Sequence, residues 1–196
     1  MTETTTLGLL RHGQTDWNVD FRLQGVTDIP LNETGLAQAR AAAAVLRSGD
    51  WDVLLTSPLV RASKTAQIVA ESFGGRAAEL VVEPLLLERS FGSAEGMLHS
   101  EWLANFKNSE IAGAETRQQL ATRTQLLFER IAEAYAGRRV LAVSHGALIR
   151  EALGLASGYT LPPEGERIGN ACLNRFEYNA STGWLVSEYA PKTLGA

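Results

Sequence analysis

Two arginines and two histidines have the residue types and positions that phosphoryl transfer requires. Arg11 and His12 directly follow one apolar run, and His145 follows another. Arg61 opens a stretch of helical period. Arginine forks bind phosphate oxygens through paired hydrogen bonds, and a neutral imidazole can attack phosphorus and carry the group covalently. Because the net charge is −4, a cluster of cations indicates that an anion binds there.

A carboxylic acid for the same reaction is expected at Glu88. This residue follows the apolar residues 84–87, and a carboxyl group in that setting can protonate a departing alcohol oxygen. Glu83 and Glu95 lie close by in the sequence, and any of the three could instead be a solvated carboxylate. We take Glu88 as the general acid.

The elements that must position these residues alternate between strands and helices. Short apolar runs predict strands at residues 6–10, 53–56, 80–82 and 139–144, and two more at residues 174–178 and 184–189. Helical period is found around residues 36–46, 62–73, 120–134 and 148–155, with Asn32 as the N-cap of the first helix. This order predicts an α/β three-layer sandwich, a mostly parallel central sheet with helices on both faces.

The predicted topology brings the chemistry to one edge of the sheet. Parallel sheets bind ligands beyond the carboxyl ends of their strands. Residues 11–13, residues 57–61 and residues 144–146 each follow a predicted strand. We therefore expect three separate polar clusters to meet at that edge.

No composition shift, linker or internal repeat divides the chain, so residues 1–196 are interpreted as one domain. Residues 89–118 are the least regular part and are expected to form a lid over the substrate.

Several blocks of the sequence, in order, resemble the histidine phosphatase superfamily, also called phosphoglycerate mutase-like. The resemblance covers nearly the whole chain. The blocks are LRHGQT at 10–15 with WN at 17–18, RLQG at 22–25, PLNETG at 30–35, TSPLVRA at 56–62, LE at 87–88 and VSHG at 143–146. It implies the phosphoglycerate mutase-like fold.

The resemblance also implies roles for individual residues. His12 would be the phosphorylated nucleophile and Glu88 the proton donor. The phosphoryl oxygens would be held by Arg11, Arg61 and His145. Asn18, Gln24, Gly25 and Thr15 match further substrate-binding positions. The family needs no metal for this chemistry, and no cofactor is expected.

The phosphatase branch of the family fits the sequence better than the mutase branch. Glu88 and His145 are separated by only 57 positions, whereas cofactor-dependent mutases carry a longer insertion there. The segments FGSAEG at 91–96 and GAET at 113–116 also resemble the phosphatase branch. We therefore expect hydrolysis of a small phosphomonoester through a phosphohistidine on His12. A cofactor-dependent phosphoglycerate mutase and a non-catalytic phosphate-binding module are the alternatives.

Other residues have less specific interpretations. Trp17 and Cys172 are predicted to be core residues, and His99 a lid or surface residue. The aromatic residues Phe21, Phe91, Trp102 and Phe106 could line a pocket or pack in the core. Arg117 and Arg123 would contact a substrate anion only if the face of the helix that carries them is turned toward the substrate site.

Composition excludes several other classes of protein. Hydrophobic residues make up 45% and charged residues 20% of the 196 residues, as in ordinary globular proteins. One cysteine cannot form an internal disulfide, and no Lys/Arg run favours nucleic acid. The longest apolar run has six residues, and the first residues do not resemble a secretory signal. The expected partner is a small phosphorylated metabolite in the cytoplasm, with neither nucleic acid nor membrane, and a homodimer is the prior expectation.

Overall fold

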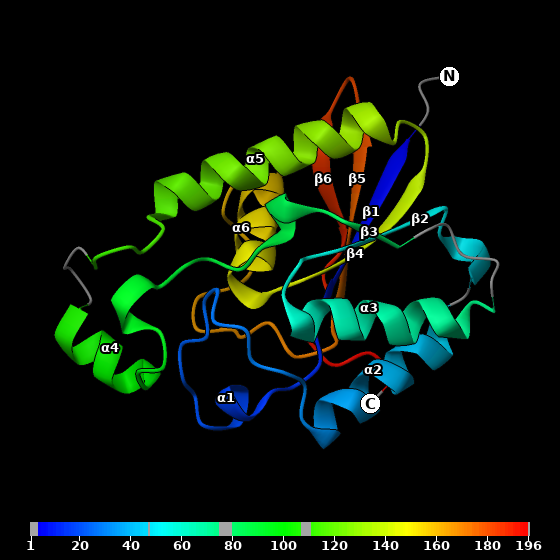
Figure 1. The fold of residues 1–196 in the computed structure, drawn as a ribbon. Coiled ribbons are helices and arrows are strands. Elements are labelled where there is room, and N and C mark those ends of the chain that lie inside the picture. Colours follow the sequence, from blue (N-terminus) through cyan, green and yellow to red (C-terminus); the bar gives the residue numbers. More distant parts are fainter. Residues whose placement is uncertain (1–3, 47, 75–79, 107–110, 196) are drawn as a thin grey trace.

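A six-stranded sheet runs through the computed structural model, which describes residues 4–46, 48–74, 80–106 and 111–195 (Figure 1). The strand order is β3-β2-β4-β1-β5-β6. Four strands run parallel to one another: β1 (Thr5–Arg11), β2 (Val53–Thr56), β3 (Leu80–Val82) and β4 (Arg139–Ser144). Two strands, β5 (Leu173–Asn179) and β6 (Gly183–Glu188), extend the sheet in antiparallel fashion from β1. The mostly parallel sheet is thus confirmed.

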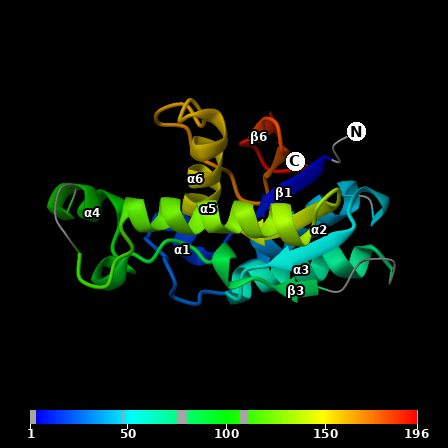
Figure 2. The same ribbon diagram turned by 90° about the horizontal axis from the view of Figure 1, so that it is seen from above.

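Helices cover both faces of this sheet. One face packs against α2 (Glu33–Val45) and α3 (Val60–Ser72), and the other against α5 (Arg117–Ala134) and α6 (Gly146–Ser157). Figure 2 shows α5 crossing in front of the strands when the molecule is seen from above. The three-layer arrangement is the one that the alternation of strands and helices predicted.

The alternation of side chains in the central strands explains the two cores. Leu7 and Leu9 point to the core under α5 and α6, whereas Leu10 points to the core under α2 and α3. Both faces of β1 are therefore covered, so its apolar residues are nearly continuous. Charged or polar residues appear where the strand ends and the backbone leaves the sheet.

The first long helix begins at the predicted cap. Asn32 Oδ1 accepts a hydrogen bond from the Gly35 backbone N–H at 2.9 Å, which satisfies one of the donors left free at a helix N-terminus. At the other end of the chain, β6 finishes at Glu188, one residue earlier than predicted.

Two short helices lie beyond the carboxyl ends of the strands, at the lower left of Figure 1. They are α1 (Asp16–Val19) and α4 (His99–Phe106). Three-residue 3₁₀ turns occupy Ser48–Asp50, Pro84–Leu86 and Gly92–Ala94. The sequence interpretation assigned no helix to residues 89–118, where the structure has α4, a helix of eight residues that fully buries none of its side chains.

Among the described residues, no helix is both long and apolar enough to cross a membrane.

Candidate active site

The predicted polar clusters meet in one pocket at the carboxyl edge of the sheet. The pocket has a volume of about 740 Å³. Arg11, His12, Arg61 and Glu88 line it. His145 follows β4 and lies directly behind His12, with the two ring centroids 5.1 Å apart. The predicted convergence of these five residues is therefore observed.

The His12 ring is held in an orientation suited to a nucleophile. The side chain is 2% exposed, and its Nδ1 lies 2.6 Å from the Gly13 carbonyl oxygen. A carbonyl can only accept, so Nδ1 carries the proton and Nε2 keeps its lone pair. Burial, followed by the charges of Arg11 and Arg61, lowers the pKa of His12 well below 6.5. The imidazole is thus neutral at neutral pH.

His145 packs against the His12 ring but does not itself line the pocket. It is fully buried, and its Nε2 lies 2.7 Å from the Ser57 hydroxyl. Its Nδ1 has no hydrogen-bond partner within the described part of the chain. Burial, with the positive charge of Arg61 next in importance, lowers the pKa of His145 well below 6.5.

Two arginines are fixed at the pocket by backbone carbonyls. Arg61 is 0% exposed and donates to the carbonyl oxygens of Gly25 at 2.7 Å and Thr27 at 2.9 Å. Arg11 donates to the Ile168 carbonyl oxygen. The Nε atoms of both arginines are buried without a partner among the described residues. Because burial disfavours the charged form, it lowers the pKa of each guanidinium.

Glu88 follows the 3₁₀ turn at Pro84–Leu86 and lines the pocket next to the start of α6. Its two oxygens lie 3.1 and 3.3 Å from the Ala147 backbone N–H, and one accepts from the Arg89 N–H at 2.9 Å. Ala147 belongs to the first turn of α6, whose partial positive charge attracts a carboxylate.

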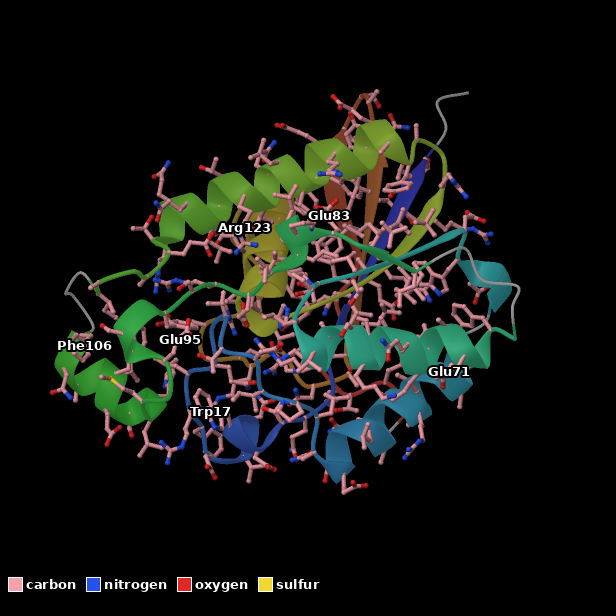
Figure 3. The ribbon with its side chains drawn as sticks, viewed as in Figure 1. Trp17, Glu71, Glu83, Glu95, Phe106 and Arg123 are labelled. Carbon is pink, nitrogen blue, oxygen red and sulfur yellow. The ribbon has the colours of Figure 1, made fainter. Side chains whose placement is uncertain are left out.

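The other two glutamates considered from the sequence have structural partners instead. Glu83 forms an ion pair with Arg130 at 3.0 Å. Glu95 accepts from the backbone N–H groups of Val26, Thr27 and Phe91. Figure 3 shows Glu95 on the green segment beside the blue loop, so its carboxylate ties two distant segments together. Of these three described glutamates, Glu88 alone lines the pocket.

Asn18, Gln24 and Gly25 line the pocket as predicted, but Thr15 does not. Thr15 is 0% exposed and caps α1, with its Oγ1 3.0 Å from Gln24 Oε1. Asn18 Oδ1 accepts from the Thr15 backbone N–H at 3.0 Å. Thr15 therefore supports the side chains of the lining from behind.

Aromatic residues surround the outer part of the pocket. Trp17, Phe21, Phe91 and Trp102 line it together with His99, an exposed residue. The prediction for Trp17 as a core residue is wrong: its side chain is partly exposed and lies over Gly96. Cys172 is fully buried in the core, as predicted.

Arg117 and Arg123, the two arginines of α5 considered from the sequence, do not line the pocket. Arg117 is exposed. Arg123 forms an ion pair with Glu115 at 2.7 Å and donates to the carbonyl oxygens of Leu85 and Leu87, both at 2.8 Å. It reaches from α5 to the segment that precedes Glu88 (Figure 3). Arg123 therefore holds the position of the predicted acid.

Several pocket residues were not found from the sequence. Asn170 donates from Nδ2 to the His12 carbonyl oxygen at 3.1 Å and to Asn18 Oδ1 at 3.2 Å. Arg89 and Arg167 also line the pocket. Arg89 directly follows Glu88, a signal that could have been used, whereas Asn170 lies in a stretch without periodicity.

No cluster of three or more His, Cys, Asp and Glu side chains within the described residues is placed to hold a metal ion.

Comparison with known proteins gives one consistent family. A phosphatase of Bacillus subtilis, the uncharacterized PhoE, is 37% identical over 185 residues, which are 94% of each chain. The probable phosphoglycerate mutase GpmB of Photorhabdus laumondii is 33% identical over 201 residues, covering 95% of this chain and 91% of its own.

A solved structure of a mycobacterial glucosyl-3-phosphoglycerate phosphatase superposes with a TM-score of 0.78 at 30% identity, and the match covers 94% of this chain and 98% of the other. The profile of the histidine phosphatase superfamily (branch 1) matches residues 7–190. With His12 and its cationic neighbours gathered at the end of β1, the chain belongs to branch 1 of the histidine phosphatase superfamily.

Proposed function

We propose that this chain hydrolyses a small phosphomonoester through a phosphohistidine on His12. The observation that carries the proposal is the neutral His12 ring, whose Nδ1–H is bound to the Gly13 carbonyl. That bond leaves the Nε2 lone pair available for attack on phosphorus. The positive charges of the buried Arg61 and the partly buried Arg11 act on the ring and suit a tetrahedral dianion.

In the first step the Nε2 lone pair of His12 forms a bond to phosphorus while the bond from phosphorus to the ester oxygen breaks. The carboxyl group of Glu88 gives its proton to the departing oxygen, so the alcohol leaves neutral. Arg11, Arg61 and His145 stabilise the negative charge on the three equatorial oxygens. Glu88 is left as a carboxylate, whose position is supported by the Ala147 N–H.

In the second step water replaces the alcohol. The Glu88 carboxylate takes a proton from the water, whose oxygen attacks phosphorus while the bond to His12 Nε2 breaks. Inorganic phosphate leaves, His12 returns to its neutral form and Glu88 is protonated again. His12, Glu88 and the attacking water together supply every proton and electron pair, and the proposed reaction is metal-independent.

The remaining pocket residues would orient the ester. In support, Asn18, Gln24 and Gly25 line the same pocket as His12, and Thr15 is hydrogen-bonded to the side chains of the first two. Of the segment at residues 89–118, residues 107–110 lie outside the described residues, and the described part contributes Phe91, His99 and Trp102 to the outer lining. This contribution supports the proposal that the segment is a lid that selects the substrate.

The first experiment measures phosphate release from a panel of small monoesters with a chelator present. The wild type should release phosphate and the His12→Asn variant should not. Asn keeps an N–H for the Gly13 carbonyl but has no nucleophilic nitrogen. Transfer of ³²P from the substrate to the wild type, absent in the variant, should follow. Full activity of a folded His12→Asn variant would overturn the proposal, and loss of wild-type activity in chelator would overturn metal independence.

The role of Glu88 has its own test. Replacing it with Gln should slow hydrolysis of an alkyl phosphate by at least about 100-fold, within the usual range for general acid catalysis. The loss should be smaller for p-nitrophenyl phosphate in a single turnover, because p-nitrophenolate leaves without a proton. Equal losses for the two esters would argue against Glu88 as the acid.

The mutase alternative is supported by the similarity to GpmB of Photorhabdus laumondii. A mutase would return the phosphoryl group from His12 to a second hydroxyl group of the same substrate skeleton. Incubation with 3-phosphoglycerate and a bisphosphorylated primer, followed by NMR, distinguishes the two: the 2-phosphate isomer indicates a mutase and free phosphate a phosphatase. Binding of phosphate without either product would indicate the non-catalytic module.

We also propose a cytoplasmic location and a homodimer. The free, buried Cys172 fits a reducing compartment, and two-fold dimers are the commonest soluble assemblies. Fractionation of cells and light scattering of the purified protein test these two proposals.

A further inference from the structure

The backbone of the proposed nucleophile is fixed at both of its polar groups. The His12 N–H donates to the Ser144 carbonyl oxygen at 3.0 Å, and the His12 carbonyl oxygen accepts from the Ala171 N–H at 3.2 Å. The Asn170 side chain donates to the same oxygen at 3.1 Å. The end of β4 and the segment that precedes β5 therefore determine where the His12 backbone lies.

The next residue, Gly13, sets the direction of the His12 ring. Its carbonyl oxygen lies 2.6 Å from His12 Nδ1, so a rotation of the Gly13 backbone moves the group that orients the imidazole. A Cβ on Gly13 would lie 2.3 Å from the Gly35 carbonyl oxygen, so the position requires glycine. Glycine also has the greatest conformational freedom of any residue. Hydrogen bonds must therefore restrict its rotation.

Thr65 makes the hydrogen bond on the other side of Gly13. The Gly13 N–H donates to Thr65 Oγ1 at 3.2 Å, and the Thr65 hydroxyl donates to the Arg61 carbonyl oxygen at 2.8 Å. A hydroxyl group has one proton and two lone pairs, so donation to Arg61 leaves the lone pairs for the Gly13 N–H. The side chain of Thr65 is 0% exposed, and solvent therefore does not compete for either bond.

These two bonds connect the loop of the nucleophile with a proposed phosphate-binding residue. Arg61 and Thr65 lie about one turn apart on α3. The Arg61 guanidinium is itself fixed by the carbonyl oxygens of Gly25 and Thr27. The same helix thus holds the cation with one residue and the Gly13 backbone with another. Attack on phosphorus requires that spacing, because reacting atoms must be held in a productive geometry.

We propose that Thr65 is a positioning residue for the phosphorylation of His12. Its hydroxyl holds the Gly13 backbone so that the Gly13 carbonyl keeps His12 Nε2 aimed at a phosphoryl group on Arg61. The inference rests on the proposed function, because it takes His12 as the nucleophile. Thr65 is outside the described lining of the pocket, so it acts through Gly13 and His12 and neither gains nor loses a proton.

Thr124 is a matched control within the same chain. It is also 0% exposed, lies in α5 and donates from Oγ1 to the Leu120 carbonyl oxygen, four residues earlier, at 2.8 Å. Thr65 makes the equivalent bond to Arg61 at the same distance. The two threonines differ in the bond to Gly13, and Thr124 is also outside the described pocket lining. If Thr65 served only the stability of its helix, Thr65→Val and Thr124→Val would both leave the rate unchanged.

The test measures single turnovers of p-nitrophenyl phosphate, whose leaving group needs no proton, so the rate reports attack by His12. Valine has nearly the shape of threonine but no hydroxyl group, so Thr65→Val leaves the Gly13 N–H without its acceptor. The rate constant should fall at least about tenfold, since a displacement of about 1 Å can cost about 100-fold. The Kd of inorganic phosphate should stay close to that of the wild type, because Arg61 keeps its carbonyl partners. Thr124→Val should keep the wild-type rate.

Thr65→Ser and Thr65→Ala form a second pair that differs only in a hydroxyl group, and this pair decides the question if Thr65→Val does not fold. Because serine keeps the acceptor for Gly13, Thr65→Ser should exceed Thr65→Ala in rate by about as much as the wild type exceeds Thr65→Val. NMR of the His12 ring gives a readout independent of turnover. The Nδ1–H proton should move upfield in Thr65→Val and Thr65→Ala, since its bond to the Gly13 carbonyl lengthens, and should keep its position in Thr65→Ser and Thr124→Val.

The outcomes separate this inference from the proposed function. If the wild type hydrolyses the ester but a folded Thr65→Val is as fast as Thr124→Val, or Thr65→Ser is as slow as Thr65→Ala, the inference is wrong and the phosphatase stands. If no ester is hydrolysed but the His12 signal moves in Thr65→Val and Thr65→Ala alone, Thr65 orients the ring and the proposed activity is wrong.

Discussion

The two buried histidines make the stability of this protein depend on pH in a predictable direction. Both His12 and His145 have their pKa lowered by burial first and by neighbouring arginine charges next. In the unfolded chain each imidazole regains its ordinary pKa of about 6.5. Below that pH the unfolded state therefore binds more protons than the folded state, and the free energy of unfolding falls. Above about pH 7.5 both states are neutral and the contribution is complete.

The magnitude follows from the pKa of the unfolded state. If the folded histidine takes up no proton, acidification from pH 7 to pH 5 costs about 2 kcal/mol for each residue. This figure is an upper bound, since protonation of the folded form reduces it. His12→Asn and His145→Gln should each remove up to about 2 kcal/mol from the loss seen in the wild type. Asn preserves an N–H for Gly13, and Gln can reach the hydroxyl of Ser57.

The assay is urea unfolding at pH 7 and pH 5 in phosphate-free buffer, because a bound anion would add its own stabilisation. The difference between the two pH values, compared between wild type and variant, cancels the contribution of the carboxylates. His99→Gln is the control, since His99 is exposed. The reasoning is refuted if His12→Asn loses as much stability on acidification as the wild type. The folded His12 would then take up its proton as readily as the unfolded chain.

Three further predictions concern positioning. Arg61→Gln should lower kcat/KM about 100- to 1,000-fold; a loss under tenfold in steady-state kinetics would contradict its role on the phosphoryl group. Arg123→Gln breaks a largely buried ion pair with Glu115. It should lower the free energy of unfolding in urea by about 3 kcal/mol and lower kcat at least tenfold. Full activity would show that Glu88 is positioned without Arg123. Gly35→Ala would place a Cβ 2.0 Å from the Gln14 carbonyl oxygen and should destabilise by about 3 kcal/mol, whereas Gly49→Ala, with open space, should be nearly neutral in the same assay.

The positions of His12 and His145 were predictable because the strands that precede them are buried on both faces of the sheet. Residues 7–10 and 140–143 are almost wholly apolar, which is the pattern of a strand covered by helices on both faces. A parallel arrangement brings the ends of such strands to one edge. His12 and His145 follow those ends and therefore had to lie near each other. The distance between their rings, 5.1 Å, agrees with that expectation.

The outer part of the pocket was not predictable by the same reasoning. Trp17 was expected in the core, packed under the loop that follows the first strand; here it covers Gly96 at the pocket. Asn170 comes from a stretch without strand or helix, so no periodicity indicates where its amide lies. The helix α4 is only eight residues long and fully buries none of them. A hydrophobic pattern cannot reveal elements that bury so little.

Polar contacts between distant segments, rather than hydrophobic periodicity, determine where the outer lining lies. The Glu95 carboxylate joins its own segment to the loop at Val26 and Thr27, and the same loop supplies the carbonyl that holds Arg61. A change in the outer segment can therefore reach Arg61, the proposed phosphate-binding arginine, through two hydrogen bonds. It follows that substitutions at Glu95 should alter kcat as well as substrate preference, even though its carboxylate is outside the pocket lining. The proposed lid and the proposed phosphate-binding Arg61 are thus linked by hydrogen bonds through the loop at Thr27.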